Sequence, residues 1–163
     1  MKLWGIDLGG TKIECAVLDS ENNLSVITRK RVPTEANQGY EHILNQIVKL
    51  VNLVSEELGE KPTKIGFATP GVLDPETQTM KNCNTTSMNG RPMKTDLAKA
   101  LGVPVELAND ANCFALAEAT MGIVRDVLPD AKVVFGVILG TGVGGGVIVN
   151  GQVINGRHGI GGE

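Results

Sequence analysis

A glycine-rich turn near the N-terminus carries residue types that suit a phosphate ligand. The stretch GIDLGGTKIECAV places an acid, two glycines, a threonine and a lysine between two apolar runs. Successive glycines let the backbone approach a ligand closely, so that N–H groups can face an anion. The pattern predicts phosphate binding, and the alternative is an ordinary hairpin turn with a solvated acid and lysine. The candidate residues are Asp7, Gly9, Gly10, Thr11 and Lys12.

Asp7 would repel a phosphate directly, but a carboxylate is a preferred ligand of Mg²⁺. It stands at the end of the first apolar run, directly before the glycine turn. We therefore expect Asp7 to hold magnesium, through a bound water, beside the phosphates.

A second glycine turn, GVILGTGVGGGVIV, lies far downstream and lacks both the acid and the lysine. It contains a GxGxxG pattern, but a dinucleotide-binding fingerprint requires a helix immediately after the glycines. The residues that follow, VIVNGQVI, are typical of a strand. We expect Gly140, Thr141 and Gly142 to form a second phosphate loop; a tightly packed hairpin is the alternative.

Asn109 and Asp110 stand where a predicted strand ends and a predicted helix begins, in ANDANCFALAE. A helix N-terminus favours negative charge, so Asp110 should stay ionised. An ionised carboxylate can accept the proton of a hydroxyl as that hydroxyl attacks phosphorus. Asparagine and aspartate are also common N-caps, and a purely structural capping role is the alternative.

The hydrophobic pattern places these residues on a series of strands and helices. Residues 38–60 have apolar side chains at helical spacing, with Asn37 as a candidate N-cap and Gly59 as the stop. Residues 70–93 are polar, with three prolines, and predict a long loop whose Asn and Thr side chains suit sugar hydroxyls or plain solvent. Predicted strands cover residues 2–8, 12–19, 23–32, 63–69, 103–108, 132–139, 145–150 and 151–155; predicted helices cover 38–60, 94–101 and 109–122, and residues 124–130 form a connector.

The order βββαβαβα, followed by further strands, indicates an α/β protein. Short connections predict an antiparallel meander of the first three strands, and the strand–helix–strand succession predicts a parallel crossover. The opening LGGT has a counterpart in LGTG, which starts at Leu139. We therefore expect two lobes with similar openings: residues 1–125 form the first, and residues 126–163 form the start of a second.

Composition narrows the class of protein. Hydrophobic residues make up 42% and charged residues 20% of the 163 residues, and the net charge is −3. That charge argues against a nucleic-acid or anionic-membrane surface, and no apolar run reaches the roughly 20 residues that span a bilayer. Three scattered cysteines without CxxC spacing predict reduced thiols in a cytoplasmic protein. The end in the glycine-rich GRHGIGGE predicts a fragment.

Taken together, four motifs in this order resemble the ROK family of bacterial sugar kinases. They are DLGGTK, ATPGVLD, ANDANCFALAE and the long stretch from GVILGTG to the C-terminus. The resemblance implies the ribonuclease H-like, actin-like ATPase fold and the ATP-dependent phosphorylation of a hexose hydroxyl.

The resemblance also implies roles for individual residues. Asp110 would be the catalytic base; the first glycine turn, with Asp7, would serve the ATP phosphates and Mg²⁺; and Gly140 to Gly142 would form the second phosphate loop. The sugar-binding residues implied, with Asn84 added on weaker grounds, are Gly71, Asn84, Asn109, Asp110 and Glu163.

The departures from the family pattern lead to further expectations. The histidine of its E-x-x-H motif, its cysteine-rich zinc segment and most of its adenosine-binding lobe are missing, so structural zinc would belong only to a full-length protein. We expect this fragment not to turn over. A homodimer is implied by the family alone, and the hexose stays open among fructose, glucose, mannose and N-acetylhexosamines.

Some members of the family are transcriptional regulators with a DNA-binding segment ahead of the DxGGTK motif. Asp7 leaves no room for such a segment here, and Lys12 and Asp110 are retained, which favours the kinase. One rival hypothesis is a sugar-sensing regulator without its DNA-binding domain. A second is an actin-like or Hsp70-like ATPase without a sugar substrate, and the ANDANC segment argues against it.

Overall fold

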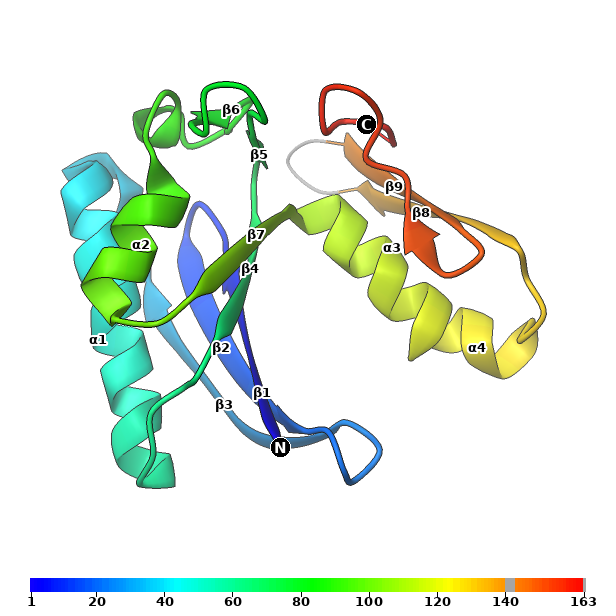
Figure 1. Cartoon of the computed structure of the whole chain (residues 1–163), viewed down its shortest axis with the longest axis horizontal. Coiled ribbons are helices and arrows are strands. Elements are labelled where there is room, and N and C mark those ends of the chain that lie inside the picture. The colour runs from blue at the N-terminus through cyan, green and yellow to red at the C-terminus, as the bar shows by residue number, and fades with distance from the viewer. Residues whose placement is uncertain (140–142, 163) are drawn as a thin grey trace. The chain divides into compact units, whose positions relative to one another are not determined.

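The computed structural model describes residues 1–139 and 143–162. The chain forms two compact units, Met1–Leu107 and Ala108–Glu163. In the first unit the strand order of the sheet is β3-β2-β1-β4-β7 (Figure 1). Strand β1 pairs antiparallel with β2 and parallel with β4, and β2 pairs antiparallel with β3, which confirms the predicted meander and crossover. The strands are β1 (Lys2–Leu8), β2 (Lys12–Asp19), β3 (Ser25–Pro33), β4 (Ile65–Thr69) and β7 (Val105–Asn109).

Two helices, α1 (Tyr40–Leu58) and α2 (Met93–Leu101), cover one face of this sheet (Figure 1). The apolar side chains of α1 recur every three or four residues, and they bury against the alternate, inward-facing side chains of β2. This packing forms the core of the unit. The largest fully buried side chains include Ile6, Leu8, Ile13, Ile43, Ile47, Leu50, Ile65 and Phe67.

The structure confirms the predicted residue at the C-terminal end of α1 but not the predicted N-cap. Gly59 follows the helix in the left-handed conformation, as the prediction of a stop requires. The prediction of Asn37 as N-cap is wrong, because Asn37 lies inside a separate 3₁₀ turn, Ala36–Gln38, and Gly39 is the residue before the helix.

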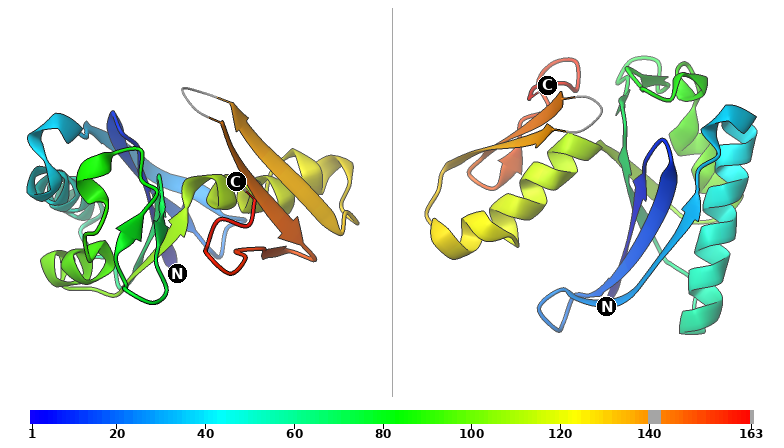
Figure 2. Two further views of the ribbon diagram at one scale, coloured as in Figure 1. Left: turned by 90° about the horizontal axis from the view of Figure 1, so that it is seen from above. Right: turned by 180° about the vertical axis from the view of Figure 1, so that it is seen from behind.

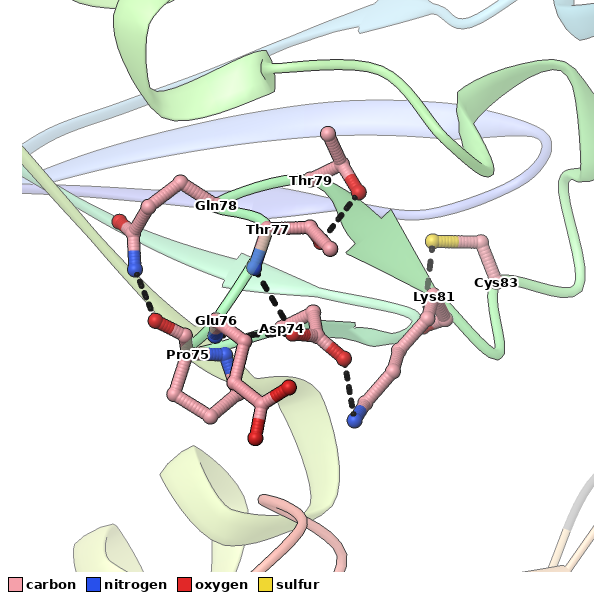
Figure 3. Close-up of polar contacts among 8 residues, drawn as sticks. All are labelled: Asp74, Pro75, Glu76, Thr77, Gln78, Thr79, Lys81 and Cys83. Atoms are coloured by element: carbon pink, nitrogen blue, oxygen red, sulfur yellow. Dashed lines mark hydrogen bonds and ion pairs between the residues drawn. The ribbon is translucent and has the colours of Figure 1, made fainter.

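Residues 70–93 are more ordered than the predicted loop. They contain a short hairpin, β5 (Val72–Leu73) with β6 (Met80–Lys81), and a 3₁₀ turn, Thr86–Met88. Figure 3 shows that the Asp74 carboxylate organises the hairpin: it accepts hydrogen bonds from Lys81 Nζ at 2.9 Å and from the N–H groups of Thr77 at 3.1 Å and Glu76 at 2.9 Å. These three donors hold the pKa of Asp74 well below its usual range.

The second unit has its own three-stranded sheet, with strand order β10-β9-β8. Its strands are β8 (Val133–Leu139), β9 (Val143–Val149) and β10 (Gln152–Val153), and adjacent strands pair antiparallel. Helix α3 (Asp110–Thr120) packs against β8 and β9 (Figure 2). Every second side chain of β8 is exposed and apolar, namely Val133, Phe135, Val137 and Leu139.

The predicted connector at residues 124–130 is wrong in part, because α4 (Ile123–Val127) occupies most of it. A five-residue helix is too short for periodicity to reveal. Whether residues 108–125 belong to the first lobe, as the predicted boundary has it, stays a prediction. No helix in the described part of the chain is long and apolar enough to cross a membrane.

Substitutions on α1 test the packing of the first unit. Ile47 is 0% exposed, whereas Leu53 on the same helix is 40% exposed. We expect Ile47→Ala to lower the free energy of unfolding by about 2–5 kcal/mol, because it removes buried methyl groups and leaves a cavity. Leu53→Ala should change it by less than about 1 kcal/mol.

The measurement is denaturant unfolding followed by fluorescence of Trp4, the single tryptophan, which is buried in this unit. Equal losses in the two variants would contradict the assigned inner face of α1.

Candidate functional site

The first glycine turn connects β1 to β2 and closes on itself. The N–H of Gly9 donates to the carbonyl of Lys12 at 3.0 Å. A Cβ atom at Gly9 would lie 2.9 Å from that same carbonyl oxygen, closer than real Cβ contacts allow. The turn therefore needs glycine at this position because of close backbone approach.

Thr34, which the sequence did not single out, donates two hydrogen bonds to carbonyl groups of this turn. Thr34, which is 1% exposed, donates its hydroxyl to the carbonyl of Gly9 at 2.7 Å and its N–H to the carbonyl of Thr11 at 3.0 Å. The only signal in the sequence is a threonine directly after the strand that pairs with β2. That signal does not reveal a contact between residues 25 positions apart.

The two charged residues of the turn are both exposed. Asp7 stands at the carboxyl end of β1, and Lys12 begins β2 and makes no ion pair with any residue that the structure describes. Mg²⁺ in phosphate sites keeps several waters and takes only one or two carboxylates, so a single exposed acid beside the turn fits it. No cluster of three or more potential metal ligands occurs among the described residues, and such a cluster would be needed to hold zinc.

The polar loop that carries Asn84 lies beside the glycine turn. A Cβ atom at Gly10 would lie 3.5 Å from the hydroxyl oxygen of Thr85, the residue after the exposed Asn84. Asn89 fixes the start of this loop: its Oδ1 accepts from the N–H of Cys83 at 2.9 Å, and its Nδ2 donates to the Cys83 carbonyl at 3.1 Å.

Gly71 belongs to the same neighbourhood. A Cβ atom there would lie 2.5 Å from Cys83 Sγ and 2.6 Å from the Lys81 carbonyl oxygen, so the two chain segments can touch only through glycine. The hydroxyl of Thr69 donates to the Gly71 carbonyl at 3.1 Å. The structure thus brings together Gly71, the loop of Asn84 and the glycine turn within the first unit.

Asn109 and Asp110 lie in the second unit, at the junction of β7 and α3. The side chain of Asn109 is buried and accepts from the N–H of Asn112 at 3.1 Å, so Asn109 is the N-cap of α3. Asp110 is the first residue of the helix and is half-buried; its Oδ1 accepts from the N–H of Ala111 at 2.8 Å. The capping role expected as an alternative therefore belongs to Asn109, and Asp110 takes the position where the helix N-terminus favours a carboxylate.

The remaining predicted site residues, Gly140, Thr141, Gly142 and Glu163, lie outside the described residues. The strand β9 begins at Val143, immediately after the predicted second phosphate loop. A strand in this place rules out the helix that a dinucleotide-binding fingerprint requires, as the sequence indicated.

The comparisons with known proteins agree with one another. The N-acetyl-D-glucosamine kinase of Pectobacterium atrosepticum is 39% identical over 160 residues, which cover 98% of this chain and 50% of that protein. The corresponding kinase of Haemophilus influenzae is 42% identical over 160 residues, with the same coverage. The chain thus spans about half the length of the curated relatives it matches.

The solved structures extend the comparison to the fold. A ROK hexokinase from Thermus thermophilus matches with a TM-score of 0.82 and 33% identity, covering 100% of this chain and 52% of that one. A ROK family glucokinase from Streptomyces griseus, solved with glucose and AMPPNP, matches with a TM-score of 0.84 and 29% identity, covering 100% of this chain and 49% of that one. The fold is therefore the actin-like ATPase fold of ROK sugar kinases. A ROK family transcriptional regulator, at 20% identity and a TM-score of 0.78, shares that fold.

The family model with the description "ROK family" matches residues 3–163, nearly the whole chain. The four motifs quoted from the sequence all lie within this range. This chain belongs to the ROK family.

Proposed function

We propose that this chain is the N-terminal portion of a kinase that transfers the γ-phosphoryl group of ATP to a hydroxyl of a hexose. The observation that carries the proposal is the glycine turn, which is held in one conformation with the exposed Asp7 and Lys12 on either side of it. Its relatives are named as sugar kinases, and one of them was solved with glucose and AMPPNP.

In the proposed reaction the residues of the turn neutralise charge. Backbone N–H groups and Lys12 contact phosphate oxygens, and Asp7 holds Mg²⁺ through water. Mg²⁺, when bound with ATP, offsets the charge that develops on the transferred group. Gly140, Thr141 and Gly142 are proposed as the second phosphate loop, on the evidence of the sequence alone.

Asp110 is proposed as the general base. Its carboxylate accepts the proton of the attacking hydroxyl, and it stands at the N-terminus of α3, next to the residue that caps the helix. Gly71, Asn84, Asn109 and Glu163 are the proposed sugar contacts. N-acetyl-D-glucosamine and glucose are the first sugars to test, because they are the substrates in the names of the relatives.

We also propose that the 163 residues do not turn over without the polypeptide that makes up the other half of the relatives. Two observations support this: the chain covers 50% of those kinases, and four apolar side chains of β8 are 46–77% exposed on one face of the second sheet. A face of that kind is usually covered by further polypeptide.

The first test is turnover by the purified 163-residue chain with Mg·ATP and a panel of hexoses. We expect no sugar-dependent release of ADP above background, because the chain spans only about half the length of the kinases that it resembles. Release at a rate like that of the complete protein would contradict this proposal.

The second test is Asp110→Asn in the complete protein. We expect kcat to fall by about 10²–10⁴, because the amide cannot accept the proton, while the affinity for sugar stays within a few-fold. Asparagine is a good helix-terminal residue, so folding should be kept. Asp130→Asn, at an exposed position of the same unit, is the matched control and should leave kcat unchanged.

The same experiment separates the kinase from a sugar-sensing regulator, which the shared fold of a ROK regulator keeps as the second candidate. A regulator binds sugar with no turnover in the wild type, so Asp110→Asn would have no activity to remove.

A further inference from the structure

One buried residue, Thr34, binds two peptide groups of the first glycine turn, Gly9–Gly10 and Thr11–Lys12. Its hydroxyl is bonded to the carbonyl of Gly9 and its N–H to the carbonyl of Thr11, at 2.7 Å and 3.0 Å. The C=O and N–H of a trans peptide point in opposite directions. Because both carbonyls point toward Thr34, the N–H groups of Gly10 and Lys12, which belong to the same two peptide groups, point away from it; Gly10 and Lys12 are exposed residues.

The turn would not hold this arrangement unaided. Glycine populates several backbone conformations with nearly equal ease, and two successive glycines lose much freedom when they are fixed in one. An anion-binding turn gains affinity when its N–H groups are already oriented, since the cost of ordering them is met in folding rather than in binding. The two hydrogen bonds from Thr34 select the orientation that an anion needs.

Thr34 is itself held in place from the core of the unit. Gln46, on α1 and 7% exposed, donates from Nε2 to the carbonyl of Pro33 at 2.7 Å. Pro33 pairs with Lys12 as the last residue of the edge strand β3, a place where the missing N–H of proline is tolerated. The N–H of Thr34, the next residue, donates to the carbonyl of Thr11.

We infer that Thr34 is a positioning residue, which preorganises the glycine turn for the phosphate groups of a nucleotide. It acts through the turn and does not contact the ligand, because its side chain is buried behind the backbone of Gly9. The inference rests on the proposed function, in which this turn binds the phosphates of ATP.

The test compares three variants of the complete protein by calorimetric binding of Mg·AMPPNP. Thr34→Val removes the hydroxyl at nearly constant shape, and Thr34→Ser retains it. Thr28→Val is the matched control: Thr28 lies on β3, the strand that Thr34 directly follows, and its hydroxyl donates to Glu57 at the exposed surface. Far-ultraviolet circular dichroism and Trp4 fluorescence check that each variant is folded.

We expect Thr34→Val to raise the Kd for Mg·AMPPNP about tenfold or more and to leave the Kd for the sugar within twofold, since displaced N–H groups lose phosphate contacts only. The Kd of Thr34→Ser for Mg·AMPPNP should stay within about threefold of the wild-type value, because the hydroxyl is kept. The Kd of Thr28→Val should equal that of the wild type. A general loss of structure would instead weaken nucleotide and sugar alike and would not be rescued by serine.

An unchanged nucleotide Kd in folded Thr34→Val overturns the inference, and so does an equal weakening of sugar and nucleotide. If Thr34→Val does not fold, Gln46→Leu carries the test, because it releases Pro33 and keeps the hydroxyl; unchanged nucleotide affinity there also overturns the inference. The proposed function fails separately, if the wild-type protein binds no Mg·AMPPNP or phosphorylates no hexose.

Discussion

The pairing of β1 with β2 on one side and with β4 on the other decides where the chemistry of the first unit can lie. Because β1 and β4 are parallel, their carboxyl ends meet at the same edge of the sheet. Asp7 therefore emerges beside the end of β4, which leads through Thr69 to Gly71. The antiparallel return of β2 places the glycine turn at that edge as well. Backbone pairing thus brings together two separate stretches of sequence, Asp7 to Lys12 and Thr69 to Gly71.

The two units carry different parts of the proposed chemistry. The first unit presents a glycine turn with an acidic residue, Asp7, and a basic residue, Lys12. Beside the turn lies a polar loop that hydrogen bonds of Asn89 and Asp74 stabilise. The second presents Asp110 at the start of a capped helix. This division agrees with the asymmetry of the two glycine turns in the sequence, in which only the first carries charged side chains.

Much of the fold could be predicted because its signals are local. The spacing of apolar residues defined α1, and the short connections defined the meander. The hairpin in residues 70–93 could not be predicted, because its strands have two residues each and are held by side-chain bonds to Asp74. The prediction of Asn37 as N-cap is wrong because the chain forms a separate 3₁₀ turn, Ala36–Gln38, and enters α1 only after Gly39. The contact of Thr34 could not be predicted, because it joins residues 25 positions apart and no local sequence pattern indicates such a contact.

We propose that this ROK chain belongs to an enzyme that transfers the γ-phosphoryl group of ATP directly to a sugar hydroxyl. The most direct test is to measure ADP and sugar phosphate together in the complete protein over a panel of hexoses. We expect one hexose class to give both products in equal amounts and ADP release to stop without sugar. Release of ADP that does not depend on sugar, or sugar binding with no release at all, would contradict the proposal.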